Sequence, residues 1–368
     1  MKGQNSMPYV FDLHSDIVTD IAVRRAKGEQ RVFARRHYPR LMRAGVRAMI
    51  AVLWVEPQYR SVGPSRFLQL LGSLMADLEE CREEAELVRT AEGLTGAVDA
   101  GKVGIFLGVE GLSFVEQWPL LEMRGETADT LVAGGVGKEN PGPAEDFQGE
   151  EPGLEEKLRQ ALGVLGPMGL RHAILTWGTS NRIAGAAGDP GSGAGMSGLT
   201  AFGRHTVRTL QSQGVVLDVS HLDDISIDGV LDVGDGPVIA SHSNARALCD
   251  VPRNLLDRHI REIGARGGVI GLNAYPKFVD LDHPTMDRFI DHILYMADLI
   301  GIDHVAFGFD FMDYLTDEDF QVPENAELRS VEDVPRLLER MSERGLTDAE
   351  IEKVAFANAS RMMSHVLR

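Results

Sequence analysis

The chain has 368 residues, of which 43% are hydrophobic and 25% charged, and its formal net charge is −18. This composition is that of an ordinary soluble globular protein, and the negative charge argues against nucleic acid or an anionic membrane as a partner. No stretch approaches the roughly 20 apolar residues of a membrane span. The polar start, Met1–Pro8, does not resemble a secretory signal, and two cysteines do not suggest a disulfide framework, so we expect a cytoplasmic location.

Eight short apolar segments, separated by stretches of helical period, predict strands that alternate with helices. In chain order the expected strands are Tyr9–Leu13, Arg47–Leu53, Val103–Val109, His172–Thr176, Val215–Val219, Pro237–Ser241, Gly268–Leu272 and His304–Gly308. Strands that alternate with helices predict a parallel sheet, and eight such units over this length predict a (β/α)8 barrel. We therefore expect residues 1–368 to form a single α/β barrel domain.

Amphipathic spacing of apolar residues predicts the helices. They are expected over Ser65–Thr90 (with the pattern continuing through Cys81 to Leu87), in a short segment that ends by Gly101, and over Leu154–Leu165, Thr200–Gln213, Leu255–Gly264, Pro284–Ile300, Val331–Arg344 and Thr347–Leu367. Thr347 with Glu350 three residues later predicts a capping box at the last helix.

Two stretches fit neither period and are expected to be loops. Arg124–Gly153 is a long acidic insertion after the third strand, and Gly185–Gly198 is rich in glycine. Loops of this length are usually functional or disordered. For the insertion, a mobile or oligomer-contacting excursion and a substrate lid both remain open.

Residues that could bind a metal, a proton or a substrate follow five of the eight expected strands. They are His14 and Asp16 after the first strand, Glu110 after the third, His221 after the fifth, His242 after the sixth and Asp310 after the eighth. In a (β/α)8 barrel the active site lies at the C-terminal ends of the strands. The six side chains are therefore expected to converge on one mouth of the barrel.

The types and spacing of these residues indicate a metal site. His14 and Asp16 are two residues apart, so in extended backbone both side chains point the same way and can hold one cation. Imidazoles and carboxylates without thiolates suit zinc or a similar first-row metal. Three histidines and two acids exceed the three protein ligands of one catalytic zinc, and two metals that share Glu110 as a bridge account for the surplus. Such a pair of metals is typical of hydrolytic chemistry.

Each candidate also has a structural explanation. A single histidine at a strand end is more often hydrogen-bonded within the fold than bound to a metal, Glu110 alone could form a salt bridge, and Asp310 alone could cap a helix. For His221 and His242 the balance reverses, because the same Ser-His pair ends two successive strands. The other histidines are expected to be structural: His37, His172, His205, His259, His283, His292, His304 and His365.

Short motifs at the strand ends resemble those of the membrane (renal) dipeptidase family, peptidase family M19 of the amidohydrolase superfamily. The resemblance extends through most of the chain and is carried by Asp12-Leu13-His14-Ser15-Asp16, Gly108-Val109-Glu110-Gly111, Leu175-Thr176-Trp177, Gly198-Leu199-Thr200, Leu217-Asp218-Val219-Ser220-His221, Ser241-His242-Ser243-Asn244-Ala245-Arg246, Arg253-Asn254 and Gly308-Phe309-Asp310-Phe311. It implies a barrel hydrolase with two zinc ions per chain. His14 and Asp16 would bind one ion, His221 and His242 the other, and Glu110 would bridge them.

The same resemblance implies roles for further residues. Asp310 would act as the proton shuttle, which activates the water between the metals and then protonates the leaving amine. Arg253 would pair with the C-terminal carboxylate of the substrate through its planar fork of donors. Tyr275 lies where the family has a tyrosine that contacts the substrate.

The chain departs from the family pattern at several places near this site. Trp177 stands where the mammalian enzymes have a histidine that polarises the substrate. Glu-Gly-Gly-His has become Glu110-Gly111-Leu112-Ser113, and Gly-Asp-Phe-Asp-Gly reads Phe309-Asp310-Phe311-Met312-Asp313. These changes bear on the substrate range more than on the metal centre.

The expected function is that of a binuclear zinc dipeptidase for small dipeptides, with a D-residue at the C-terminal side left open. The alternatives are a related amidohydrolase that acts on another small amide or a lactone, and a non-catalytic barrel that binds metals. A deaminase is disfavoured because the first strand carries His-x-Asp rather than His-x-His. The expected partner is a small dipeptide, without nucleic acid or membrane, and a homodimer is left open.

Overall fold

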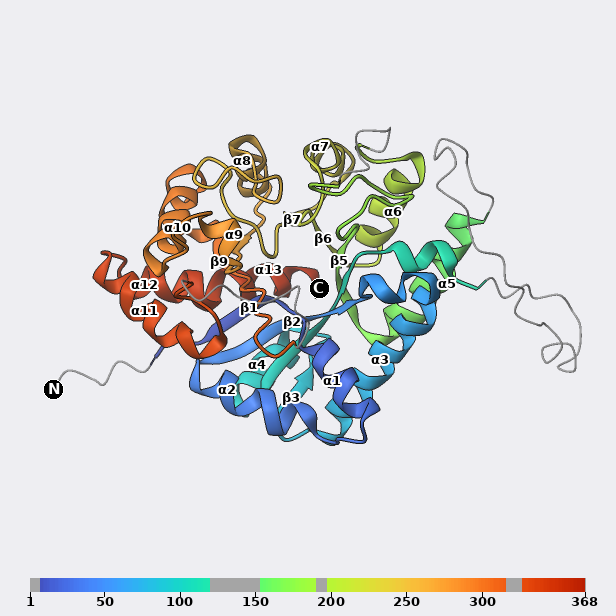
Figure 1. Cartoon of the computed structure of the whole chain (residues 1–368), viewed down its shortest axis with the longest axis horizontal. Helices are drawn as coiled ribbons and strands as arrows, with labels where there is room; N and C mark the ends of the chain where they lie inside the picture. The colour runs from blue at the N-terminus through green and yellow to red at the C-terminus, as the bar shows by residue number, and fades with distance from the viewer. Residues whose placement is uncertain (1–6, 120–152, 190–196, 316–325, 368) are drawn as a thin grey trace, which may run out of the picture.

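The computed structural model describes residues 7–119, 153–189, 197–315 and 326–367. Its centre is a parallel sheet surrounded by helices (Figure 1). The strands are β1 (Val10–Ser15), β2 (Val46–Trp54), β3 (Ala85–Leu87), β4 (Val103–Glu110), β5 (Leu170–Ile174), β6 (Val216–Asp218), β7 (Val238–Ile239), β8 (Ile270–Leu272) and β9 (Val305–Phe307). Eight of these strands neighbour one another in the order β7-β6-β5-β4-β2-β1-β9-β8, and β3 pairs with β4 beside this path.

The two ends of this strand order meet and close the barrel. Ala240, just past β7, forms a parallel bridge with Ile270 of β8, and the N–H of Gly271 donates to the carbonyl of Ala240 at 2.8 Å. Glycine is needed at this seam because a Cβ on Gly271 or Gly308 would lie 2.0 or 1.7 Å from the carbonyl oxygen of Ser241. The predicted (β/α)8 barrel is confirmed.

One predicted helix is too long, and a short strand takes its place. Helix α3 (Gly63–Glu80) ends where the N–H of Cys81 bonds the carbonyls of Asp77 and Leu78. The chain then turns, and β3 pairs with the first half of β4. The apolar spacing continues into this region because Ala85 and Val88 are buried, but their backbone groups pair with a strand. The expectation of a helix up to Leu87 is therefore wrong.

Most of the other helices lie where the sequence predicts them. These other helices are α1 (Ile17–Ala26), α2 (Tyr38–Arg43), α4 (Ala91–Asp99), α5 (Leu154–Met168), α6 (Ala201–Ser212), α7 (Asp224–Val233), α8 (Asp257–Ala265), α9 (Pro276–Val279), α10 (Met286–Ile300), α11 (Val334–Glu343), α12 (Asp348–Glu352) and α13 (Asn358–Val366). Of these, α1, α2, α7 and α9 were not predicted. The capping box is confirmed, since the Thr347 side chain accepts from the N–H of Glu350 and the Glu350 carboxylate from the N–H of Thr347. The last predicted helix is divided, because a π-helical turn at Lys353–Ala357 separates α12 from α13.

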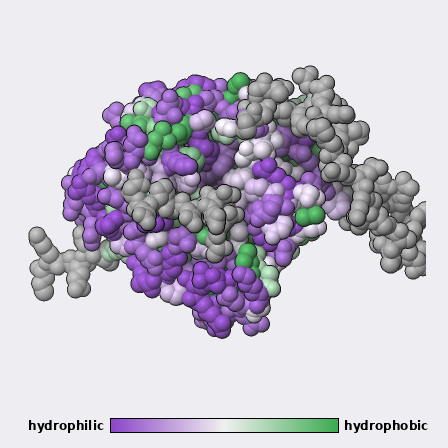
Figure 2. All heavy atoms as spheres, viewed as in Figure 1, coloured by the Kyte–Doolittle hydropathy of each residue, from purple (hydrophilic) through white to green (hydrophobic). Residues whose placement is uncertain are grey.

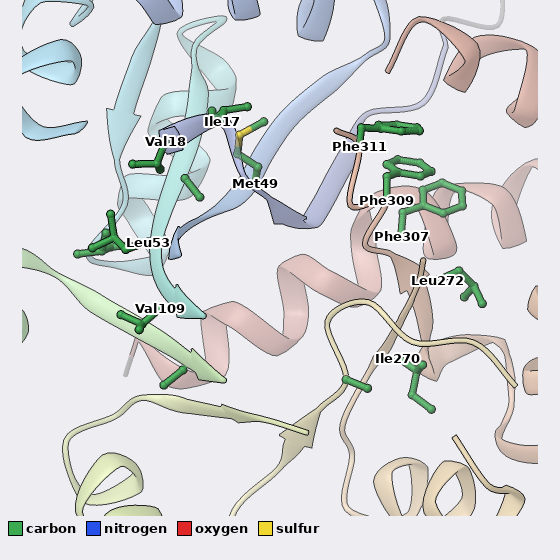
Figure 3. Close-up of a cluster of buried hydrophobic side chains, with 14 of the residues drawn as sticks. Ile17, Val18, Met49, Leu53, Val109, Ile270, Leu272, Phe307, Phe309 and Phe311 are labelled. Carbon is green, nitrogen blue, oxygen red and sulfur yellow. The ribbon is translucent and has the colours of Figure 1, made fainter. Parts of the chain in front are cut away.

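Buried apolar side chains form two layers. The larger layer lies between the strands and the surrounding helices, where Phe307, Phe309 and Phe311 stack with ring centroids 4.7 and 4.9 Å apart (Figure 3). The smaller layer fills the barrel, and the methionines of α13, Met362 and Met363, pack against it at the end where the strands begin. Polar side chains gather at the other end of the barrel, where the strands end.

The outer surface is mainly hydrophilic on the face shown in Figure 2, with hydrophobic residues in separate small spots. Within the described residues no helix is long and apolar enough to cross a membrane. Cys81 and Cys249 are both buried and free. Most of the expected insertion Arg124–Gly153 and the centre of the expected loop Gly185–Gly198 lie outside the described residues. That the whole chain forms one domain stays a prediction.

Candidate metal centre and active site

A cavity of about 150 Å³ opens at the C-terminal ends of the strands. Its walls are formed by Asp16, Trp54, Glu110, Trp177, His221, Tyr275, Phe278, Asp310, Met312 and Leu315. Six of the nine site residues that the sequence predicts therefore line it. His14 and His242 are also in the cluster but are fully buried beneath it, and Arg253 contacts the backbone of His242 from behind.

The predicted ligands form one compact cluster around Glu110. Its Oε1 lies 2.9 Å from Nε2 of His221, 3.5 Å from Nε2 of His14 and 3.6 Å from Nε2 of His242. The Nε2 atoms of His221 and His242 are 2.9 Å apart. On the other side, Nε2 of His14 lies 3.6 Å from Oδ2 of Asp16. The ends of four strands, β1, β4, β6 and β7, thus bring the five predicted ligand side chains together, with the carboxylate of Glu110 in the middle.

The spacing of the donor atoms in this cluster is suited to a metal ion. Donor atoms of His14, Glu110 and His242 all lie within 4.8 Å of one another, as do those of His14, Asp16 and Asp310. Among the described residues, neither ring nitrogen of His14 nor Oδ1 of Asp16 has a hydrogen-bond partner, although these atoms are buried. Buried polar atoms are normally satisfied. Unpaired imidazole and carboxylate donors at one point are therefore consistent with a cation held between them.

Burial and charge set the protonation of this cluster. Burial and, to a smaller extent, the positive charge of Arg253 together lower the pKa of His221 to about 4. Burial also holds the pKa of His242 well below its usual value, so both rings are neutral, which is the form that binds a metal. Burial would lower the pKa of His14 too, but the carboxylates of Glu110 and Asp16 outweigh it and raise that pKa. A cation would replace the proton of His14.

Two of the site residues have an unusual backbone conformation. Only three non-glycine residues in the described ranges have positive φ, and two of them are His221 (68°) and Asp310 (58°). Such conformations are costly for residues with a side chain and persist where the surroundings hold them. Each of the two turns its side chain at the end of a strand, β6 and β9, toward the cluster around Glu110.

Two buried carboxylates that the sequence analysis left out hold these strand ends. Oδ1 of Asp218 accepts from the N–H groups of Ser220 and Ser241, the residues that precede His221 and His242. Oδ1 of Asp12 accepts from the N–H groups of His14 and Phe309, and Phe309 precedes Asp310. Each carboxylate thus ties two neighbouring strands next to a site residue. The available signal was their position, two or three residues ahead of a histidine at a strand end.

A third group, His172, completes the support beneath the site. Its Nε2 lies 2.6 Å from Oδ2 of Asp218, and both side chains are fully buried. This contact lowers the pKa of Asp218 against the effect of burial, which alone would raise it. The carboxylate therefore stays charged. His172 accordingly has the structural role that the sequence analysis expected.

We expect Asp218→Asn to weaken metal binding about 10- to 100-fold, as is typical of residues that orient metal ligands. Asparagine lacks the negative charge that accepts from the N–H groups of Ser220 and Ser241 and that pairs with His172. Competition with a chelator measures the affinity, and thermal unfolding of the metal-free protein shows any loss of fold. Asp228→Asn is the matched control, because Asp228 also pairs with a histidine but lies away from the site. Its Oδ1 is 2.9 Å from Nε2 of His259. Equal metal affinity of the two variants would contradict the role given to Asp218.

The remaining predicted residues lie around the cluster. Asp310 accepts from Nδ2 of Asn273 at 3.0 Å, and burial raises the pKa of its carboxyl group. Arg253 donates to the carbonyl of His242 at 3.2 Å, and its guanidinium lies 5.3 Å from the centre of the Phe278 ring. Tyr275 and Trp177 stand in the wall of the cavity, Trp177 with its ring centre 6.0 Å from that of His221.

Fold and site together define the class of protein. A (β/α)8 barrel with imidazoles and carboxylates gathered at the ends of its strands is the arrangement of a metal-dependent hydrolase. The family model described as membrane dipeptidase (peptidase family M19) matches residues 156–368. The chain belongs to the membrane dipeptidase family, as its motifs predicted, and the predicted class of metal-dependent hydrolase is confirmed with it.

Several curated proteins are similar in sequence. An uncharacterized protein encoded in the pqqA 5' region of Klebsiella pneumoniae is 32% identical over 228 residues, which are 60% of this chain and 78% of that protein. Dipeptidase verJ of Clonostachys rogersoniana is 25% identical over 312 residues, 85% of this chain and 67% of that protein. An uncharacterized dipeptidase of Schizosaccharomyces pombe is 33% identical over 199 residues, which are 53% of this chain and 46% of that protein, so the match spans less than half of this relative.

Solved structures show the same fold. A metallopeptidase of family M19, dipeptidase AC, is 21% identical, and the two structures superpose with a TM-score of 0.75 over 97% of this chain and 98% of that one. A metallopeptidase of Rhodobacter sphaeroides, solved with a phosphinate mimic of the dipeptide L-Ala-D-Ala, is also 21% identical, with a TM-score of 0.74 over 97% and 99% of the two chains.

Proposed function

We propose that this chain is a zinc-dependent dipeptidase with two metal ions per chain. The observation that carries the proposal is the convergence of His14, Asp16, Glu110, His221 and His242 in one buried cluster below a small cavity, with Asp310 beside it. His14 and Asp16 would hold one ion, His221 and His242 the other, and Glu110 both. When bound, the ions would polarise the scissile carbonyl and activate a water molecule.

Asp310 is suited to move the proton. Its Oδ1 lies 3.9 Å from Nε2 of His14, at the edge of the ligand cluster, and its other oxygen is fixed by Asn273. Asn273 is fixed in turn, because its Oδ1 accepts from the N–H of Tyr275 at 2.6 Å. Burial raises the pKa of Asp310, so this carboxyl group can take a proton and release it again near neutral pH.

Arg253 is suited to hold the free carboxylate of a dipeptide. Two of its donors bond to His242 and Ser243, while its buried Nε lacks a partner among the described residues. A half-buried arginine next to a cavity favours an anion there, because the guanidinium binds a carboxylate with charge-assisted hydrogen bonds. The solved relative from Rhodobacter sphaeroides holds a mimic of L-Ala-D-Ala, which supports a dipeptide substrate and a D-residue at its C-terminal side.

We expect Arg253→Ala to impair hydrolysis of free dipeptides by about 10- to 100-fold in kcat/KM, and hydrolysis of their C-terminal amides far less. The reason is that only the free dipeptide offers a carboxylate to the guanidinium, and a charged hydrogen bond contributes roughly 1.5–3 kcal/mol. Arg258→Ala is the control, since Arg258 is an exposed arginine that pairs with Asp228. Equal activity of the unmodified enzyme on a dipeptide and its amide would remove the clamp.

That last result would favour the other candidate, an amidohydrolase for a different small amide or a lactone. The observation in its favour is Trp177, which places an indole in the cavity wall at the point where the family resemblance expects a polarising imidazole. A panel of L-L, L-D and D-D dipeptides with amide and lactone substrates, run on zinc-loaded protein, separates the two. Retained metal without turnover on the whole panel would point to a metal-binding barrel. The cytoplasmic location and a homodimer stay predictions.

A further inference from the structure

Two tryptophans form one wall of the cavity. Trp54 ends β2 and Trp177 follows β5, on either side of Glu110 at the end of β4. Their ring centres are 4.7 Å apart, with an angle of 58° between the ring planes. Trp54 is 4% exposed and thus fixed by the surrounding core, whereas Trp177 presents part of its ring to the cavity. The pair makes a broad aromatic surface beside the ligand cluster.

The contacts around Trp177 hold this surface in place without substrate. Nη2 of Arg60 donates to the carbonyl of Trp177, and the guanidinium lies 5.9 Å from the centre of the indole. The N–H of Thr179 donates to the same carbonyl at 2.7 Å. Gly111 has a φ of +81°, and a Cβ there would lie 3.3 Å from the Cβ of Trp177. The wall is therefore preformed, which favours binding because little ordering is needed.

The opposite wall comes from the other side of the barrel. Tyr275, Phe278, Met312 and Leu315 follow β8 and β9, which are separated from β2 and β5 by β1 on one side and by β6 and β7 on the other. Arg253 lies against this wall, over the ring of Phe278. A dipeptide whose carboxylate pairs with Arg253 and whose scissile carbonyl lies at the ligand cluster would thus extend its N-terminal residue toward Trp54 and Trp177.

We propose that the wall of Trp54 and Trp177 selects dipeptides with a large apolar, preferably aromatic, side chain at the N-terminal residue. This inference rests on the proposed dipeptidase function. The polar groups that line the described cavity, Asp16, Glu110, His221 and Asp310, all belong to the proposed metal and proton machinery. A charged side chain at the N-terminal residue would lose its hydration without gaining a partner on the tryptophan wall. An aromatic ring would stack on it, and about 150 Å³ is enough space for one such ring.

The test compares kcat/KM for a series Xaa-Gly, with Xaa as Gly, Ala, Leu, Phe, Lys or Asp, on the zinc-loaded enzyme. We expect Phe-Gly to exceed Gly-Gly by roughly 10-fold or more, and Lys-Gly and Asp-Gly to fall below both. Trp177→Ala should lower the ratio of Phe-Gly to Gly-Gly to near one. Trp118→Ala is the matched control, because Trp118 packs against Phe114 and does not line the cavity. The ratio does not depend on the fraction of active enzyme, so a partial loss of fold does not affect it.

Turnover with no preference for Phe-Gly, or a preference that Trp177→Ala leaves unchanged, would overturn the inference. A dependence on Trp177 in the reversed series Gly-Xaa alone would also overturn it, because the wall would then face the C-terminal residue. Absence of turnover on every dipeptide would instead count against the proposed function. In that case the binding of Phe-Gly and Gly-Gly to the zinc-loaded protein is measured by calorimetry. Tighter binding of Phe-Gly that Trp177→Ala abolishes would support selection by the tryptophan wall. Equal binding of the two dipeptides, or no binding, would overturn it.

Discussion

Replacement of Asp310 by asparagine is expected to lower turnover about 10²- to 10⁴-fold while the protein keeps its metal content and its fold. The carboxyl group stands beside the five proposed ligand side chains, and Asp310 itself has a left-handed backbone at the end of β9. Asparagine has nearly the same shape and can still accept from Asn273, but it cannot take up a proton at that position. Steady-state kinetics on the zinc-loaded variant, with elemental analysis of the same sample, measures both effects.

A neighbouring acid provides the control for Asp310. Asp313 follows on the same loop and pairs with Arg40 outside the cavity, so Asp313→Asn should retain turnover. If Asp310→Asn binds less metal than the unmodified protein, Asp310 is a ligand, in agreement with its place near His14 and Asp16. If it keeps near-normal turnover, the proton passes through another group.

Replacement of Glu110 by alanine is expected to release both metals together and to abolish turnover. Its Oε1 lies between 2.9 and 3.6 Å from the Nε2 atoms of three imidazoles. The other two carboxylates of the described cluster, those of Asp16 and Asp310, are close to His14 alone. Metal content after zinc reconstitution and dialysis is the measurement. Glu156→Ala, at an exposed glutamate on α5 that pairs with Arg159, is the control for the loss of a negative charge. A variant that keeps one zinc per chain would show that Glu110 belongs to a single metal.

The sequence predicted the barrel and the members of its ligand cluster for a definite physical reason. Parallel strands that are buried on both faces form nearly continuous apolar runs, so the polar residues that follow each run mark the mouth of the barrel. His14, Glu110, His221 and His242 are residues of this kind, and the structure brings them together. Their roles as ligands stay part of the proposal.

Other features depend on contacts that no local pattern contains. Asp12 and Asp218 lie inside expected strands and were given no role, but each accepts a hydrogen bond from the backbone of a neighbouring strand. Trp54 and Phe278 meet the cavity only because β2 and β8 stand on different sides of a closed barrel. Likewise β3 has helical spacing and becomes a strand because the edge of β4 offers it backbone partners.

The central claim, a dipeptidase that works with two metals, is tested most directly by a zinc titration of metal-free protein. Bound zinc and the hydrolysis of one free dipeptide, Phe-Gly, are measured in the same samples, beside the C-terminal amide of that dipeptide. We predict that turnover of the free dipeptide rises until two zinc ions are bound per chain and that the amide is hydrolysed far more slowly. Full turnover at one zinc per chain, or undiminished turnover in the metal-free protein, would contradict the claim.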